Sequence, residues 1–292
     1  MNNRSWRHHY IPKFYLNGFT SGQGRFKIFD VEKNQFVKEG KDFSPESYFF
    51  EKDGNTLISE REKSDFLESS YAKRDSAVAE IFNRINQSNA QEKFNLTDED
   101  IAQIQYFIGV MYWRVPSNFD EIMSIIDRKK LKELGVILQD RSSGAKIEDE
   151  HMEMRIKHDP NFLKFMKAHF PAISFPELFE CKTPLHILPF PKGLPSICSD
   201  NPIICRNPKT FRVYTDDLIF PINANKLFVR GQRSKDFYTS VKLSIDLISY
   251  KQAKHYVSCT DERYIDELND LFIKHGSNLD AVRSYVFDTM LG

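Results

Sequence analysis

Two adjacent histidines, His8 and His9, are the residues near the start of the chain best suited to acid–base chemistry. Neighbouring side chains point to opposite faces of a strand and diverge by about 100° in a helix, so only one of the two is expected to face a site. A neutral imidazole in that position would act as a general base or as a metal ligand. The structural alternative is that a histidine packs against the aromatic residues that follow and anchors the N-terminal segment. The sequence leaves both interpretations open.

A second polar group, the run from Ser199 to Pro202, joins two apolar segments that are typical of strands. A residue before proline is restricted to extended geometry, which places Asp200 and Asn201 at a strand end. There the Asp200 carboxylate would bind a metal or orient a histidine, and the Asn201 amide would contact a substrate. The alternative is a turn in which both side chains bond the nearby backbone. No G-x-S-x-G motif surrounds Ser199, so the sequence does not indicate a serine hydrolase.

Arg114 stands at the end of an apolar helical pattern. A guanidinium group binds phosphate or carboxylate through two parallel hydrogen bonds, which makes Arg114 a candidate for substrate binding. The alternative is that it pairs with a buried carboxylate such as Asp75, or bonds the last carbonyl groups of its own helix.

The middle of the chain, from about residue 57 to residue 171, is predicted to be mainly helical. Apolar residues recur at helical spacing from residue 57 to residue 87. Thr97 and Asp100 form a capping-box pattern that predicts the start of another helix, which ends near Arg114.

The strands are expected on both sides of this helical section. Alternating residues between positions 25 and 38 predict an N-terminal hairpin, and short apolar runs between about 182 and 258 predict further strands. We expect the hairpin and the later strands to share one sheet, packed against the helical middle and the C-terminal helices. The predicted fold class is α+β, with residues 1–292 forming a single domain.

Composition excludes several classes of protein. Lys plus Arg and Asp plus Glu number 41 each, so no overall positive field attracts nucleic acid, and any such site must be local. The four cysteines form no C-x-x-C pair and are expected to be reduced thiols in the cytoplasm. No segment approaches the roughly 18 apolar residues of a membrane span, and the glycines lack the spacing of nucleotide-binding loops. Neither a membrane nor a nucleotide cofactor is therefore expected.

Two motifs carry a resemblance to a known family. HHYIPKFYLNGFT occupies residues 8–20, and SDNPI occupies residues 199–203, followed by an IFP strand at 219–221. With these motifs in this order, the chain resembles the bacterial family catalogued as domain of unknown function 4238 (DUF4238) over nearly its full length. The resemblance implies a Glu in the long helix where this chain offers Asp75, a shorter carboxylate that would still bind a proton or a metal. It implies no established reaction.

Histidine, aspartate and arginine are the residue types that move a proton and neutralise the charge of a phosphorane. The first hypothesis is therefore a hydrolase of the phosphodiesterase or nuclease type, with nucleic acid as substrate and a divalent Mg²⁺ or Mn²⁺ ion as cofactor. Such an enzyme would act as an effector in phage defence or in a toxin–antitoxin pair. No residue of the sequence supports this part of the hypothesis. The candidate site residues are His8, His9, Asp75, Arg114, Asp200 and Asn201.

The second hypothesis is a non-enzymatic ligand- or protein-binding module. In this hypothesis the same polar residues form a structural network. The polar segment 139–150 is expected to be a mobile loop, and either this loop or Arg114 binds the ligand or protein partner. A third hypothesis, a protein that stacks nucleic-acid bases, draws on the 25 phenylalanines. The zero net charge and the lack of a basic stripe interleaved with aromatic residues count against it.

Overall fold

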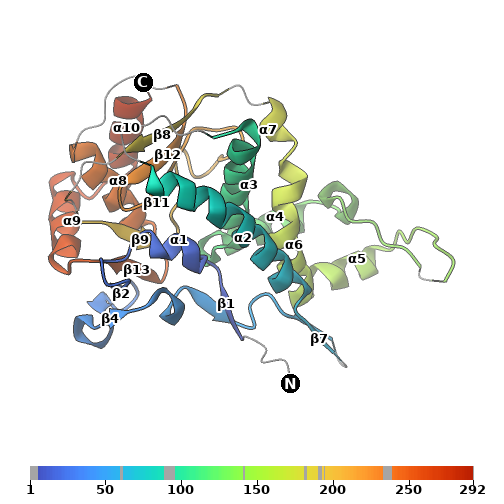
Figure 1. Ribbon diagram of the computed structural model, residues 1–292. Helices are drawn as coiled ribbons and strands as arrows, with labels where there is room; N and C mark the ends of the chain where they lie inside the picture. The colour runs from blue at the N-terminus through green and yellow to red at the C-terminus, as the bar shows by residue number, and fades with distance from the viewer. Residues whose placement is uncertain are drawn as a thin grey trace.

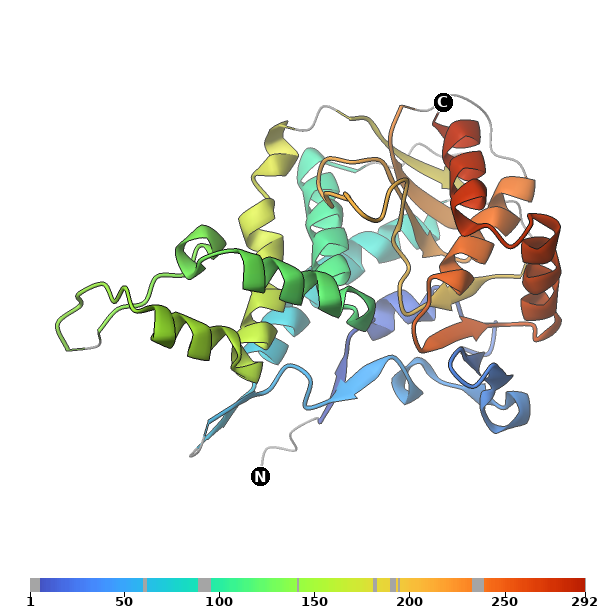
Figure 2. The ribbon, with the colours of Figure 1, turned by 180° about the vertical axis from the view of Figure 1, so that it is seen from behind.

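A computed structural model describes residues 6–59, 62–88, 96–140, 142–180, 183–189, 193, 195–232 and 239–291 of the chain (Figures 1 and 2). The helices are α1 Lys13–Asn17, α2 Phe66–Gln87, α3 Asp98–Arg114, α4 Phe119–Arg128, α5 Glu150–Lys157, α6 Pro160–Ser174, α7 Glu177–Glu180, α8 Thr239–Lys251, α9 Arg263–Lys274 and α10 Leu279–Met290. The strands are β1 Arg7–His9, β2 Phe26–Asp30, β3 Gln35–Phe36, β4 Asp42–Phe43, β5 Phe50–Lys52, β6 Leu57–Ile58, β7 Lys63–Ser64, β8 Leu185–Pro189, β9 Ile197–Ser199, β10 Ile204–Cys205, β11 Leu218–Asn223, β12 Lys226–Arg230 and β13 Tyr256–Cys259. The predicted α+β class is confirmed.

The strands form two main sheets rather than the single sheet expected from the sequence. In the first, the predicted hairpin of β2 and β3 pairs through β13 with β9, and β4 also pairs with β2. In the second, the order is β10-β11-β12-β8. The chain passes from one sheet to the other between β9 and β10, where Pro202 lacks the N–H that a continuous ladder would need. Two further antiparallel pairs, β1 with β5 and β6 with β7, are separate from both sheets.

Both faces of β11 and β12 are buried, and successive side chains of these strands enter different cores. Leu218 and Phe220 of β11 contribute to a core shared with α1, α2, α3, α4 and α6. Ile219 between them contributes to a second core shared with α8, α9 and α10. Phe228 and Val229 of β12 divide in the same way. This period of two is the geometry of a strand with apolar surroundings on each side, and it places β11 and β12 between two groups of helices.

Local signals explain the helix boundaries in the first half of the chain. The predicted capping box is present, because the Asp100 N–H donates to Thr97 Oγ1 at 3.1 Å and the Thr97 N–H donates to Asp100 Oδ2 at 3.0 Å. Helix α3 ends at Arg114, and the extended residue Val115 then precedes Pro116. The predicted helix over 57–87 was too long, since its first residues form the β6–β7 pair.

Helix α8 was missed within the section predicted to be rich in strands. Its residues 244–250 are all buried, as are Val241 and Lys242. A helix that is enclosed on every side has no polar face, so the apolar stripe that identifies an amphipathic helix is absent.

Residues 129–140 and 142–157, hereafter the arm, project from the body on the side away from α9 and α10, as Figures 1 and 2 show. The arm contains a 3₁₀ helix, Leu131–Leu134, that ends at Gly135 with a left-handed φ of 70°. A backbone bridge between Gln139 and Lys146 then closes a turn that leads into α5. Within the described parts of the chain, no helix is both long enough and apolar enough to cross a membrane.

Candidate functional site

A cavity of about 540 Å³ lies where β1, α1, α2 and the end of α3 meet. Its lining comes from segments far apart in the sequence, and it brings together three of the predicted site residues, His9, Asp75 and Arg114. The charged residues that sequence reasoning missed here are Arg7, Lys13, Glu46 and Glu68. These are common surface residue types. The only signal in the sequence was that Lys13 lies in the HHYIPKF segment and Arg7 directly before it.

The two histidines take the opposite faces of β1. His9 and Arg7 line the cavity, whereas His8 is 1% exposed and does not belong to the lining formed by the described residues. His8 Nδ1 accepts a hydrogen bond from the Asn55 N–H at 3.0 Å and lies 3.8 Å from Glu68 Oε2. His8 therefore ties β1 to the segment after β5, a structural contact that differs from the packing against the following aromatic residues considered from the sequence.

His9 has the geometry of a neutral imidazole with one free nitrogen. Its ring hydrogen-bonds the backbone of Pro45, and its buried Nε2 has no hydrogen-bond partner among the described residues. Proline offers only a carbonyl oxygen, so the ring donates through Nδ1 and keeps a lone pair on Nε2. Burial, followed by the positive charges of Lys13 and Arg114, lowers the pKa of His9 to about 4. At neutral pH His9 is thus an unprotonated base.

The His9 titration provides a direct test of this environment. The imidazole resonances of His9, assigned by their loss in His9→Asn, should titrate in NMR with a midpoint near pH 4. Because the folded pKa lies below the unfolded value, the contribution of His9 to stability is complete above about pH 6.5 and is lost as the pH falls towards 4. After allowance for solvent screening the loss is on the order of 1 kcal/mol. A midpoint near 6.5 would contradict the described surroundings of the ring.

Asp75 and Arg114 form an ion pair beside His9. The two contacts from Arg114 to the Asp75 carboxylate measure 3.1 and 3.3 Å, and Arg114 also donates to the His9 carbonyl oxygen. The guanidinium lies 4.4 Å from the centroid of the Tyr71 ring. Burial raises the pKa of Asp75, while the charge of Arg114 opposes the change. The pairing that the sequence offered as a structural role for Arg114 is present, and it fixes the guanidinium at the cavity wall.

Asp200 and Asn201 lie outside the cavity lining formed by the described residues. The Asp200 carboxylate is buried and accepts three backbone N–H groups, from Lys254 at 2.8 Å, His255 at 2.6 Å and Tyr256 at 3.0 Å. Burial raises the pKa of Asp200, and these hydrogen bonds oppose the increase. Asn201 also bonds locally: its side-chain Nδ2 donates to the Gln252 backbone carbonyl at 3.5 Å, and its backbone carbonyl accepts from Gln252 Nε2 at 2.5 Å. The SDNPI run thus ties β9 to the start of β13.

The donors of the cavity do not fit the Mg²⁺ or Mn²⁺ ion expected from the sequence. Among the described residues, no three His, Cys, Asp or Glu side chains are grouped so that they could hold a metal ion. Asp75 is paired with Arg114, and the Asp200 oxygens face backbone donors. The cavity instead combines an uncharged imidazole with three cationic side chains, Arg7, Lys13 and Arg114, and the same number of acidic ones. The acidic side chains are Glu46, Glu68 and Asp75.

Comparison with known proteins adds the family but no reaction. The family model described as "Protein of unknown function (DUF4238)" matches residues 7–279, which include every residue of the cavity and the SDNPI run. No curated protein and no solved structure matches the chain.

Proposed function

Because the chain belongs to the DUF4238 family, whose description names no reaction, we propose a function from its cavity alone: a hydrolase of phosphate diesters, of the phosphodiesterase or nuclease type. The observation that supports this proposal is the meeting of an unprotonated His9 with Arg114 and Lys13 in one cavity. A base beside fixed positive charge is the combination that transfer of a phosphoryl group to water requires.

In the proposed reaction, Arg114, Arg7 and Lys13 bind the non-bridging oxygens of the diester. His9 Nε2 takes a proton from a water molecule while the water oxygen attacks phosphorus. The bond from phosphorus to one ester oxygen breaks, and the imidazolium returns its proton to that oxygen. The products are a phosphate monoester and an alcohol. Asp75 is a positioning residue, since it holds the guanidinium of Arg114 by two contacts.

The first test replaces His9, the proposed catalytic base, and measures hydrolysis. Purified protein is incubated with labelled RNA, single-stranded DNA, duplex DNA and bis(p-nitrophenyl) phosphate, with EDTA or with Mg²⁺. We expect cleavage of at least one of these substrates and a loss of kcat of roughly 10²- to 10⁴-fold in His9→Gln. The matched control is His151→Gln, at an exposed position on α5, which should retain full activity.

A second variant separates catalysis from folding. In His9→Gly, added imidazole should restore part of the rate, because a free base can enter the space that the side chain vacates. Equal activity of wild type and His9→Gln would rule out the proposed base. Failure of imidazole to raise the rate, in a variant shown to be folded, would also count against it.

The second candidate function is a non-enzymatic module that binds a phosphate-bearing ligand. It is favoured by the existing partners of the cavity charges, since Lys13 Nζ lies 3.3 Å from Glu46 Oε1 and Arg114 is bound to Asp75. Thermal stabilisation by a mononucleotide, with no cleavage of any substrate, would select this candidate.

A further inference from the structure

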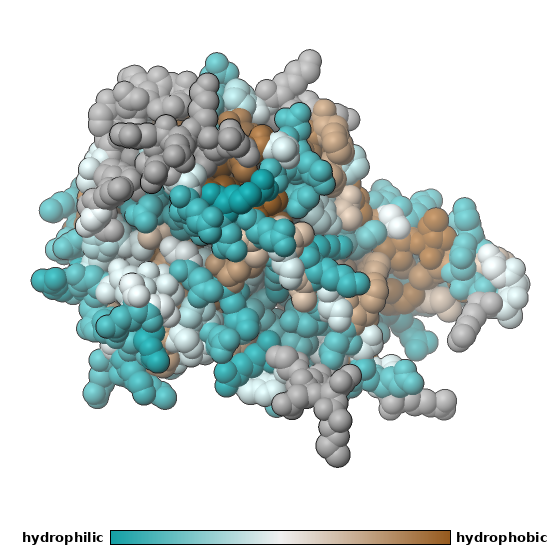
Figure 3. Space-filling view, viewed as in Figure 1, coloured by the Kyte–Doolittle hydropathy of each residue, from teal (hydrophilic) through white to brown (hydrophobic). Residues whose placement is uncertain are grey.

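The arm carries a second cavity, of about 380 Å³, that is separate from the candidate active site. Its floor is apolar and includes Leu131, Val136 and Ile147. Ile137, at the edge of this floor, is 60% exposed. Figure 3 shows hydrophobic surface on the projecting part of the molecule that Figure 1 draws as the arm. An apolar surface of this kind on a projecting segment is typical of an interaction site.

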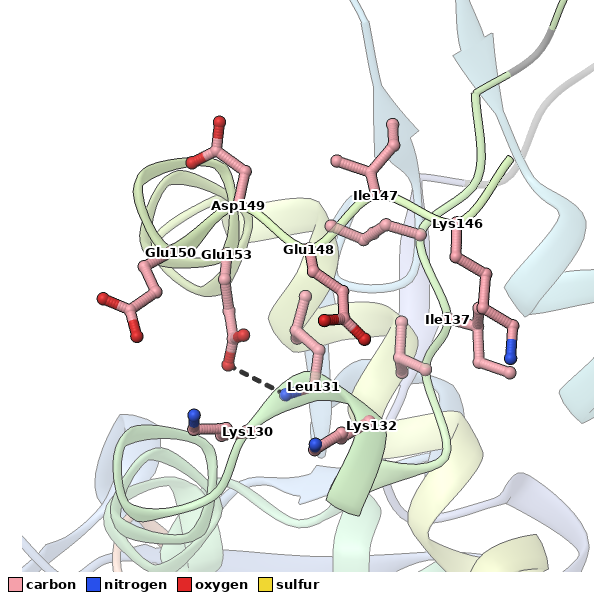
Figure 4. Close-up of a pocket in the computed structure, with 12 residues that line it drawn as sticks. Lys130, Leu131, Lys132, Ile137, Lys146, Ile147, Glu148, Asp149, Glu150 and Glu153 are labelled. Carbon is pink, nitrogen blue, oxygen red and sulfur yellow. Dashed lines mark hydrogen bonds between the residues drawn. The ribbon is translucent and has the colours of Figure 1, made fainter. Parts of the chain in front are cut away.

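Charges of opposite sign border this floor, as Figure 4 shows. Lys130 and Lys132 lie on one side, the basic wall, and the carboxylates of Glu148 and Glu150 lie across the cavity from them, the acidic wall. The segment of the acidic wall also carries Asp149 and one cationic residue, Lys146. Within the described part of the chain, neither Lys132 nor Glu148 takes part in a salt bridge, and all four side chains are exposed. The two walls are thus available to charges supplied from outside.

The cavity is held open by contacts that do not involve these four charges. Glu153 Oε1 accepts the Leu131 N–H at 2.9 Å and lies 3.3 Å from Lys157 Nζ. The buried Lys157 in turn donates to the Lys129 carbonyl at 2.5 Å. These bonds fasten α5 to the 3₁₀ helix, so the two walls keep their separation and the surface needs little rearrangement to bind a partner.

We propose that the arm is a self-association surface, on which a second copy of this chain docks about a two-fold axis with its basic wall against the acidic wall of the first. In such an isologous contact each surface meets its own copy. A partner of one sign does not fit: the acidic wall repels nucleic acid and anionic membranes, and the basic wall repels a cationic peptide. A second copy carries both signs at the required spacing, and Ile137 then enters the apolar centre inside a polar rim.

The arrangement predicts a weak, reversible dimer. Stable complexes bury roughly 800 Å² per partner, and a contact confined to one arm is expected to be weaker, with a Kd on the order of 1–100 µM. Sedimentation equilibrium of the full chain across this range of concentration should show a monomer–dimer equilibrium. Ile137→Asp should raise the Kd by at least about tenfold, because it places a charge in the apolar centre. The matched control is Ile273→Asp on α9, at a position 67% exposed, which should leave the Kd unchanged.

Charge reversal tests the two-fold pairing itself. One variant combines Lys130→Glu with Lys132→Glu, and the other combines Glu148→Lys with Glu150→Lys. Each alone should be monomeric, because like charges then face each other at both contacts. An equimolar mixture should form a heterodimer, because each reversed wall of one copy meets the oppositely reversed wall of the other.

Three results would overturn the proposal, and none of them depends on the reaction in the other cavity. The first is a wild-type chain that stays monomeric throughout the concentration range. The second is a dimer that Ile137→Asp weakens no more than Ile273→Asp does. The third is a mixture of the two charge-reversed variants that does not associate.

Discussion

Replacing Asp200 by alanine is expected to lower the free energy of unfolding by roughly 2–4 kcal/mol, one of the two largest effects of a single substitution that we predict for this chain. The Asp200 carboxylate accepts the backbone N–H groups of Lys254, His255 and Tyr256. Alanine leaves these three donors without their acceptor at a position where the Asp200 side chain is buried, and each unmade bond carries a desolvation cost. The loss follows from the fold and not from the chemistry of the cavity.

Urea unfolding followed by circular dichroism measures this change. Asp200→Asn should lose less stability than Asp200→Ala, because the amide keeps one acceptor oxygen. The control is Asp270→Ala, at an exposed position on α9, which should stay within about 0.5 kcal/mol of wild type. A variant of Asp200 that is as stable as wild type but inactive would instead restore the sequence-based hypothesis that this carboxylate takes part in the reaction.

Replacing Arg114 by methionine is expected to cost roughly 2–4 kcal/mol of stability and to abolish any activity of the cavity. The side chain of Arg114 is 4% exposed, and methionine would leave both the Asp75 carboxylate and the His9 carbonyl without their donor. The partial exposure of Asp75, at 18%, keeps the cost below that of a fully enclosed pair.

A double-mutant cycle isolates the pair from the other contacts of Arg114. Asp75→Asn, Arg114→Met and the double variant should give a coupling energy of at least about 1 kcal/mol in urea unfolding. Arg114→Lys keeps the charge but not the planar fork, so it should recover only part of the stability. Strict additivity of the two single changes would show that the contact contributes nothing to the folded state.

Elements that depend on local signals could be predicted from the sequence. Helix α3 begins at a capping box and ends before a proline, and both signals lie within the helix or next to it. Strands β11 and β12 could be recognised because a short apolar run between turn residues usually forms a strand. The division into two sheets was not predictable in this way, since it depends on which distant strands pair after Pro202.

The candidate site was predictable only in part, for a related reason. His9, Asp75 and Arg114 were identified by residue type, and the fold brings them to one cavity. From the sequence, Asp200 was an equally good candidate for the site. A carboxylate at a strand end gives the same sequence pattern whether it faces a cleft or accepts backbone N–H groups. Its partners near residue 255 lie more than 50 positions away. No local pattern distinguishes the two roles.

The bond from Arg114 to the His9 carbonyl also affects how the cavity forms during folding. It joins positions separated by 105 residues, so the chain must close a long loop before the wall beside His9 exists. Contacts of such large sequence separation form slowly compared with single helices. Ligand binding should therefore return after the helical signal when the denatured chain is refolded, and fragments that end before α3 should lack the cavity even where their own helices form.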